Sequence, residues 1–288
     1  MGQGARLGQA LPLGLNPIRE KLTDAVEGPR RQSPNDPHVV IADLSKTYEL
    51  KDDSIESIRH VSFEVERGGF LSILGPSGCG KSTFLMILAG IVPASSGIVK
   101  IDSTPVIVPR RETSLVFQVP ALFPWRSVLG NVLFPIEIFK GDLKRHHDKA
   151  LALLDMTGLA DFKDRLPEQL SGGMAQRVSL CRALITDPEL LLMDEPFSAL
   201  DALTRDEMTL ELQHIWEKFR KTVVFVTHSI REAVFLSDRV IVFSPRPAVI
   251  GCDLRIDLPR PRKLEIQETA EFNRYCAEIR ASIGVRSG

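Results

Sequence analysis

One eight-residue segment, residues 75–82, constrains the fold of this chain more than any other. It reads Gly-Pro-Ser-Gly-Cys-Gly-Lys-Ser, the pattern G-x-x-x-x-G-K followed by Ser or Thr. The apolar run Phe70–Leu74 precedes it and an apolar helical pattern follows it, so we predict a strand, a glycine loop and a helix. Glycines let backbone N–H groups surround phosphate oxygens, and the helix N-terminus adds partial positive charge. We expect Lys81 to reach the β- and γ-phosphates of a nucleotide and the Ser82 hydroxyl to coordinate Mg²⁺.

A second apolar run ends in two carboxylates and supplies the other half of such a site. It reads Leu190-Leu-Leu-Met-Asp194-Glu195, and a buried strand of this kind delivers its last residues to the carboxyl edge of a sheet, where ligands bind in open α/β folds. Asp194 is expected to hold the Mg²⁺ shell, and Glu195 is placed to polarise the attacking water. An apolar run that ends in Asp-Glu is common by itself, so its pairing with the glycine loop carries the interpretation.

Short apolar runs alternate with helical patterns along most of the chain, which indicates an α/β fold with a mainly parallel sheet. The predicted strands cover residues 70–74, 115–117, 190–193, 223–226 and 240–243, and the predicted helices cover residues 174–185, 202–220 and 230–237. Asp201 is the expected N-cap of the second helix. Residues 119–167 interrupt this rhythm with the helical pattern of Leu143, Ala150, Leu151 and Leu154, so they are predicted to be an inserted helical subdomain.

Composition excludes several classes of partner and location. The chain has 36 Lys and Arg against 37 Asp and Glu, a formal net charge of -1, which gives no electrostatic reason to expect a nucleic-acid partner. Its four cysteines lie far apart without a C-x-x-C motif, which argues against a zinc site or a disulfide framework. The uncharged run 82–99 contains Gly90 and Pro93, so it is expected to form a short helix and a turn rather than a membrane span. The proline- and glycine-rich residues 1–37 are predicted to be a flexible leader.

Three further motifs, in a fixed order, identify a family. Ser171-Gly-Gly opens a predicted helix and forms a second anion-binding site, although a serine N-cap with glycines is common by itself. Ser198-Ala-Leu-Asp201 follows Glu195, and His228 follows the next strand. Together with the glycine loop, these motifs resemble an ABC-type ATPase over residues 38–260. The resemblance implies a P-loop fold with a RecA-like parallel core, an antiparallel β subdomain and the inserted helical subdomain, followed by a short helical tail at 261–288.

The resemblance also implies roles for individual residues. Tyr48 would stack on adenine, Gln118 would contact Mg²⁺ and the attacking water, Glu195 would be the general base, and His228 would contact the γ-phosphate. The residues of the loop expected to contact ATP are Gly75, Pro76, Ser77, Gly78, Cys79, Gly80, Lys81, Ser82 and Thr83. Such ATPases work as head-to-tail dimers, so the partner copy's ATP would be contacted by Ser171, Gly172, Gly173, Met174 and Asp201.

A finer resemblance is to the ATPase subunits of nitrate, sulfonate and taurine importers. It is carried by Phe117-Gln-Val-Pro-Ala-Leu-Phe-Pro-Trp125-Arg, by 197–205, by 232–239 and by Ser244-Pro-Arg-Pro247. It implies a separate permease, indirectly a solute-binding protein, and a peripheral place on the cytoplasmic face of the membrane. Phe123, Pro124 and Trp125 are candidates for the permease contact, and the alternative is that Trp125 fills the core of the helical subdomain. A soluble ABC-type ATPase acting on nucleic acid or the ribosome is the competing function, which the neutral charge and the single P-loop disfavour.

Two side-chain patterns outside these motifs lead to separate expectations. Cys79 stands inside the phosphate loop, so the helix N-terminus is expected to lower the pKa of its thiol, and a thiol reagent there would block nucleotide binding. Phe272, Cys276, Ile279 and Ile283 form an apolar stripe at helical spacing. We expect that stripe to pack on the main domain.

Overall fold

The computed structural model describes residues 37–51 and 53–284, so the predicted leader lies outside the described residues except for Pro37. Within the described part, a six-stranded sheet runs in the order β10-β9-β3-β8-β7-β6. Its strands are β3 (Phe70–Leu74), β6 (Thr113–Val116), β7 (Leu190–Asp194), β8 (Thr222–Val226), β9 (Arg239–Phe243) and β10 (Ile250–Arg255). The first five are parallel and confirm the five predicted strands. The sixth, β10, pairs antiparallel with β9 and was not predicted.

Both faces of this sheet are buried, which explains why its strands are apolar at consecutive positions. Along β8, Val223 and Phe225 face one core while Val224 and Val226 face the other. Helices α4 (Gly172–Leu184), α5 (Ala202–Phe219), α6 (Ile230–Leu236) and α7 (Ala270–Gly284) contribute to the first core. The three helices predicted over residues 174–237 are thereby confirmed as α4, α5 and α6.

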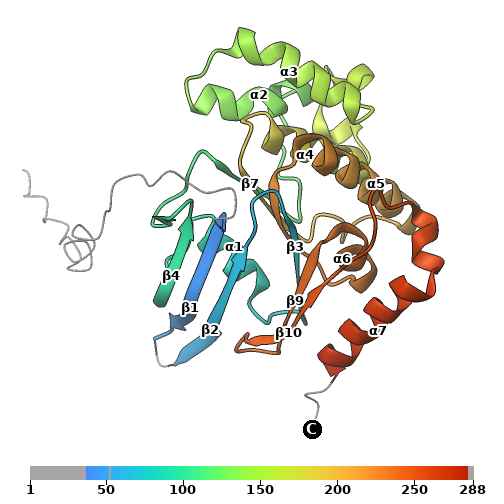
Figure 1. Cartoon of the computed structure of the whole chain (residues 1–288). Coiled ribbons are helices and arrows are strands. Elements are labelled where there is room, and N and C mark those ends of the chain that lie inside the picture. Colours follow the sequence, from blue (N-terminus) through green and yellow to red (C-terminus); the bar gives the residue numbers. More distant parts are fainter. Residues whose placement is uncertain (1–36, 52, 285–288) are drawn as a thin grey trace, which may run out of the picture. The chain divides into compact units, whose positions relative to one another are not determined.

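An antiparallel sheet covers the second core (Figure 1). Its order is β2-β1-β4-β5, from β1 (Val39–Glu49), β2 (Ser54–Val65), β4 (Ser96–Ile101) and β5 (Thr104–Pro105). Helix α1 (Lys81–Leu88) joins the two sheets, because the ring of Phe84 lies 5.6 Å from that of Phe63 in β2 and 5.6 Å from that of Phe243 in β9. The run at 82–99 begins with a short helix and a turn, as expected, and it ends in strand β4, which was not predicted.

Helices form most of the segment 119–167, above the sheet in Figure 1. They are α2 (Val128–Ile138) and α3 (Leu143–Met156), with 3-10 turns at Ala160–Phe162 and Pro167–Gln169. Leu143, which the sequence pattern assigned to the apolar face, is 41% exposed, and Leu153 is buried with Ala150 and Leu154 instead. The reason is that Leu143 stands in the first turn of α3, beside the N-cap Asp142.

The C-terminal stripe packs on the domain as predicted. Phe272, Cys276 and Ile279 on α7 are buried, and Ile283 is partly buried against the same core. A 3-10 turn, Leu264–Glu268, precedes α7. No helix in the described ranges is both long and apolar enough to cross a bilayer.

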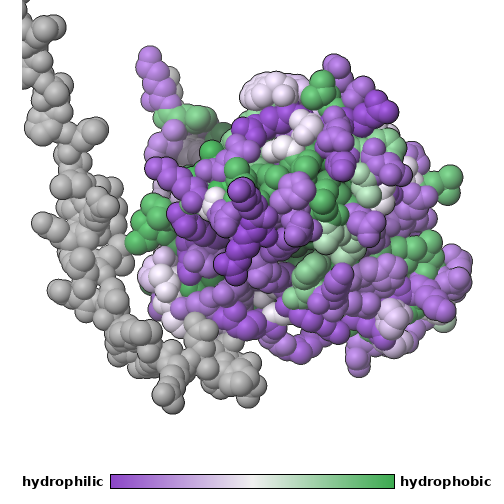
Figure 2. Space-filling model, turned by 90° about the horizontal axis from the view of Figure 1, so that it is seen from above, coloured by the Kyte–Doolittle hydropathy of each residue, from purple (hydrophilic) through white to green (hydrophobic). Residues whose placement is uncertain are grey.

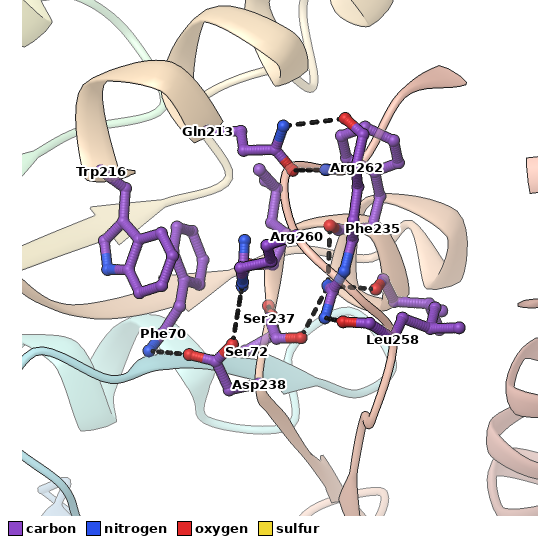
Figure 3. A network of polar contacts seen from close by, with 12 residues as sticks. Phe70, Ser72, Gln213, Trp216, Phe235, Ser237, Asp238, Leu258, Arg260 and Arg262 are labelled. Carbon is purple, nitrogen blue, oxygen red and sulfur yellow. Dashed lines mark hydrogen bonds and ion pairs between the residues drawn. The ribbon is translucent and has the colours of Figure 1, made fainter. Parts of the chain in front are cut away.

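Two arginines, the buried Arg262 and the partly buried Arg260, fasten the segment before α7 to α6 and to the sheet (Figure 3). The guanidinium of Arg262 donates to the carbonyl oxygens of Val234, Phe235 and Ser237 at 2.8–2.9 Å, and so satisfies the C-terminal end of α6. Arg260 donates to Asp238 Oδ1 at 2.8 Å, and Asp238 Oδ2 accepts from the N–H of Phe70 at 3.0 Å. This network fixes the position of α6 relative to the start of β3. Strand β3 leads into the site described next, and α6 follows that site in the chain.

Candidate nucleotide-binding site

The loop between β3 and α1 has a backbone that only glycine adopts without strain. Gly78 and Gly80 have φ of 72° and 122°, in the left-handed half of the map where a Cβ is disfavoured. A Cβ on Gly80 would also lie 2.8 Å from the carbonyl oxygen of Ser57. The loop therefore turns tightly at the N-terminus of α1, where its N–H groups can meet an anion.

Lys81, the first residue of α1, folds back over this loop. Its Nζ donates to the carbonyl oxygens of Gly75 at 2.9 Å and Pro76 at 3.1 Å, and it lies 3.5 Å from Glu195 Oε1. The ammonium group is buried. A buried cation held mainly by backbone carbonyls is available for phosphate oxygens that enter the loop.

Asp194 ends β7 directly beside the loop. Burial raises the pKa of this carboxyl, and a hydrogen bond from Ser82 partly offsets that shift. A hydroxyl and a carboxylate in contact are the hard oxygen donors that Mg²⁺ prefers. Asp194 and Ser82 thus fit the ion that the sequence implied.

Glu195 and His228 meet across the neighbouring strands β7 and β8. His228 Nδ1 lies 2.9 Å from Glu195 Oε2. Glu195 has a φ of 44°, and its N–H donates to the carbonyl oxygen of Val226 at 2.9 Å. His228 follows Thr227, whose Oγ1 donates to buried Glu232 Oε2 at 2.6 Å. The end of β7 therefore positions Glu195, and the end of β8 positions His228.

Lys81, Ser82 and Glu195 open into a cleft of about 590 Å³, and Asp194 and His228 lie outside its lining. It is lined by Tyr48, Leu50, Ile55, Ser57, Ser77, Gly78, Gly80, Lys81, Ser82, Thr83, Gln118, Glu195 and Arg246. Tyr48 is 36% exposed, and its hydroxyl lies 3.4 Å from Thr83 Oγ1. Gln118 Nε2 donates to Ser198 Oγ at 2.9 Å, so its amide nitrogen is held on the Ser198 side.

Sequence reasoning missed Arg246 as a residue of this cleft. It belongs to the Ser244-Pro-Arg-Pro247 segment, which was noted without a role. Its position follows from strand order, since β9 lies parallel to β3 and the chain leaves β9 at the same edge as the phosphate loop. A basic residue three positions after the end of a parallel strand was the available signal.

The expectation that the thiol of Cys79 has a lowered pKa is wrong. Its thiol is buried, and burial raises its pKa despite the nearby ammonium of Lys81. The side chain points into the loop rather than toward the cleft, because a Cβ on Gly75 would lie only 2.9 Å from Cys79 Sγ. Desolvation outweighs the helix N-terminus here.

The second set of predicted contacts lies elsewhere in the chain. The Ser171 hydroxyl caps α4 by accepting from the N–H of Met174 at 3.3 Å, and Gly172 and Gly173 form its first turn. Asp201 caps α5, as predicted, by accepting from the N–H of Thr204 at 3.1 Å. Of the described residues that line the cleft, none is from this set. A single chain therefore does not bring the phosphate loop and this second set of predicted contacts into one cleft.

A parallel sheet with a glycine loop, a lysine and paired carboxylates at its carboxyl edge defines a P-loop nucleotide hydrolase. Comparison with known proteins narrows this class, because residues 58–198 match the model of the family described as ABC transporter. An uncharacterised ABC transporter ATP-binding protein of Methanocaldococcus jannaschii is 45% identical over 240 residues, which cover 83% of this chain and 90% of that protein.

Curated relatives named as importer subunits are also similar. The taurine import ATP-binding protein TauB of Rhizobium johnstonii is 42% identical over 79% of this chain and 89% of its own. The nitrate import ATP-binding protein NrtD of Synechocystis is 38% identical over 84% of this chain and 93% of its own. The chain belongs to the ATP-binding subunits of ABC transporters.

Solved structures agree with this assignment. A dimeric bacterial ABC transporter cassette has a TM-score of 0.68 and 32% identity, with coverage of 77% of this chain and all of that one. A post-hydrolysis state with bound ADP and phosphate has a TM-score of 0.65 and 30% identity over the same share of each chain. The predicted fold class and the prediction of an ATPase coupled to transport are thereby confirmed.

Proposed function

We propose that this chain is the ATPase subunit that energises uptake of a small anion, such as nitrate, an aliphatic sulfonate or taurine, through a separate permease. The observation that carries the chemistry is the convergence of Lys81, Glu195 and His228 at the carboxyl edge of one sheet. The relatives named for taurine and nitrate import support the substrate class. No observation on the described residues favours the nucleic-acid alternative.

The proposed chemistry assigns one step to each group. Glu195 takes a proton from the attacking water as general base, and His228 orients that carboxylate through the 2.9 Å contact. Lys81 exchanges its carbonyl partners for β- and γ-phosphate oxygens, and the loop N–H groups hold those oxygens in place. Ser82 and Asp194 would hold Mg²⁺, which supplies charge neutralisation when bound. Gln118 would join the metal contact after leaving Ser198, and Tyr48 would stack on adenine.

A second copy of the chain completes the proposed site. Ser171, Gly172, Gly173, Met174 and Asp201 would contact the ATP held by the partner's phosphate loop. Their absence from the cleft of their own chain supports this, as does the dimeric state of the similar cassette. Hydrolysis then separates the two copies, which is the mechanical step.

The permease would dock on the helical subdomain, at the cytoplasmic face of the membrane. Trp125 is 74% exposed, which removes the alternative that it fills the subdomain's own core. Its ring lies 5.5 Å from that of Phe123, which packs at 4.3 Å on Phe134. Figure 2, seen from above, shows hydrophobic areas among the hydrophilic surface of this face. An exposed aromatic on a partly buried base is a typical interface anchor.

Growth tests this proposal directly. A strain lacking the chain should fail to use taurine, an alkanesulfonate or nitrate as its sole sulfur or nitrogen source, and the wild-type chain should restore growth. The Glu195→Gln variant should not restore it. Normal growth of the deletion strain on all three nutrients would refute the substrate class while leaving the ATPase assignment untouched.

A further inference from the structure

A histidine and two carboxylates meet at the amino edge of the six-stranded sheet, away from the nucleotide cleft. His38 precedes β1, Asp102 follows β4, and Glu189 precedes β7. His38 Nε2 lies 3.6 Å from Asp102 Oδ2 and 3.8 Å from Glu189 Oε2. One ligand atom from each residue lies within 4.8 Å of the other two. These three side chains have no part in ATP binding.

The His38 ring is fully buried and oriented by its other nitrogen. Nδ1 lies 2.6 Å from Thr222 Oγ1, which also accepts from the N–H of Gly68 at 2.9 Å. Nε2 is buried and makes no hydrogen bond, although it faces the two carboxylates. With the proton on Nδ1, the Nε2 lone pair points at two further acceptors, an arrangement that a cation stabilises.

We propose that His38, Asp102 and Glu189 bind a divalent transition-metal ion of the zinc class. An imidazole nitrogen with two carboxylates is a ligand set for such ions. Zinc bonds of 2.0–2.2 Å in tetrahedral geometry place ligand atoms roughly 3.4 Å apart, a few tenths of an ångström less than the two distances to His38. Glu189 is 48% exposed, so water can reach the fourth position.

Arg67 supports this cluster from the outer side. Its Nη1 lies 3.0 Å from Glu189 Oε2, and its Nη2 contacts Asp102 Oδ1, which leaves Asp102 Oδ2 for the ion. Ligating carboxylates are commonly hydrogen-bonded by such outer partners. Arg67 and Arg110 are cations that act on His38, and Arg110 pairs with Glu112 at 3.5 Å. Asp102 and Glu189 therefore exceed the remaining positive charge by one when the imidazole of His38 is a neutral ligand. A dication is therefore attracted to the cluster despite Arg67.

The ion would act on folding rather than on hydrolysis. Its ligands flank strands of both sheets: His38 precedes β1 and Asp102 follows β4 of the antiparallel sheet, and Glu189 precedes β7 of the six-stranded sheet. A bound ion would cross-link the two sheets at the edge opposite the phosphate loop. Zinc is therefore expected to raise the Tm of the folded chain without nucleotide.

Calorimetric titration of the chelator-treated full chain with Zn²⁺, without nucleotide, tests the site. We expect one saturable equivalent per chain and a higher Tm. His38→Gln and Glu189→Gln should each raise the Kd by about 100-fold or more. His60→Gln is the matched control, because His60 Nδ1 also lies 2.7 Å from a carboxylate oxygen, Asp43 Oδ1, but at an exposed position. Binding that is absent, or that is unchanged in both site variants, overturns the proposal.

A measurement on the wild-type chain covers the case in which His38→Gln does not fold. X-ray absorption of the protein loaded with one equivalent of Co²⁺ should show one imidazole nitrogen with oxygen ligands. Sulfur in the coordination shell would place the ion on a cysteine and overturn the proposal, as would a shell without imidazole.

Discussion

The carboxylate of Glu195 is shared between His228 and Lys81. Its Oε2 lies 2.9 Å from His228 Nδ1, while its Oε1 lies 3.5 Å from Lys81 Nζ. One side chain thus connects the ends of β7 and β8 to the phosphate loop. The geometry places a carboxylate oxygen, the candidate base, directly beside the lysine that is expected to hold the γ-phosphate.

Replacing Glu195 with glutamine should separate nucleotide binding from turnover. The amide keeps the shape of the side chain but cannot accept the proton of water, so kcat should fall by about 10²–10⁴-fold while ATP binding remains. ATP should then hold the variant as a dimer, which light scattering would detect. Glu66→Gln is the control, because Glu66 pairs with Arg255 on an exposed surface. Wild-type turnover in Glu195→Gln would refute the general-base role.

The motifs could be predicted because their chemistry fixes residue types at fixed spacings. Glycines with positive φ, a lysine at the helix start and carboxylates after an apolar strand each leave a local signature. The order of strands in a sheet leaves no local signature in the sequence, and for that reason the position of Arg246 in the cleft was missed. The burial of Arg262 was not predicted for a related reason. A charged residue is expected at the surface, and only the fold shows the carbonyl groups that surround this one.

Burial also reversed one expectation that local sequence favoured. Cys79 stands where a helix N-terminus lowers a thiol pKa, yet desolvation raises it. The balance between these two effects depends on how closely Gly75 packs against the sulfur. Sequence spacing contains no measure of that packing.

Thiol reagents should therefore modify this protein slowly at all cysteines but one. Cys79, Cys181 and Cys276 are buried, and burial raises the pKa of each thiol, to about 12 for Cys181. Cys252 is half-buried. Ellman's reagent should label one thiol rapidly in the native chain and four after denaturation. Cys252→Ser should remove the fast phase and Cys79→Ala should not, and the opposite pattern would show that the phosphate loop opens readily.

Glu211 on α5 should make stability depend on pH. Burial raises the pKa of this carboxyl to about 6, although Arg177 lies 3.1 Å away and opposes the shift. The folded chain then binds more protons than the unfolded one, so the contribution of Glu211 is full below about pH 4.5 and is lost as pH rises through about 6.

Glu211→Gln should remove that loss. The variant should be more stable than wild type by about 2 kcal/mol at pH 8 and nearly equal at pH 4.5, measured by the free energy of unfolding in urea. Glu207→Gln is the matched control, because Glu207 contacts the same Arg177 but is exposed. Lower stability of Glu211→Gln at pH 8 would mean that the ion pair with Arg177 outweighs the cost of burial.

Trp125 offers the sharpest test of the permease contact, since its removal should leave the chain's own fold intact. Its exposed ring contributes little to the core, so Trp125→Ala should keep the wild-type Tm and ATP affinity. Loss of a buried aromatic anchor from an interface costs about 2 kcal/mol or more, so co-purification with the permease should fall at least roughly 30-fold. Ile107→Ala, at an exposed apolar position between β5 and β6, should have no such effect. A complex of normal yield with Trp125→Ala would move the contact to another part of the helical subdomain.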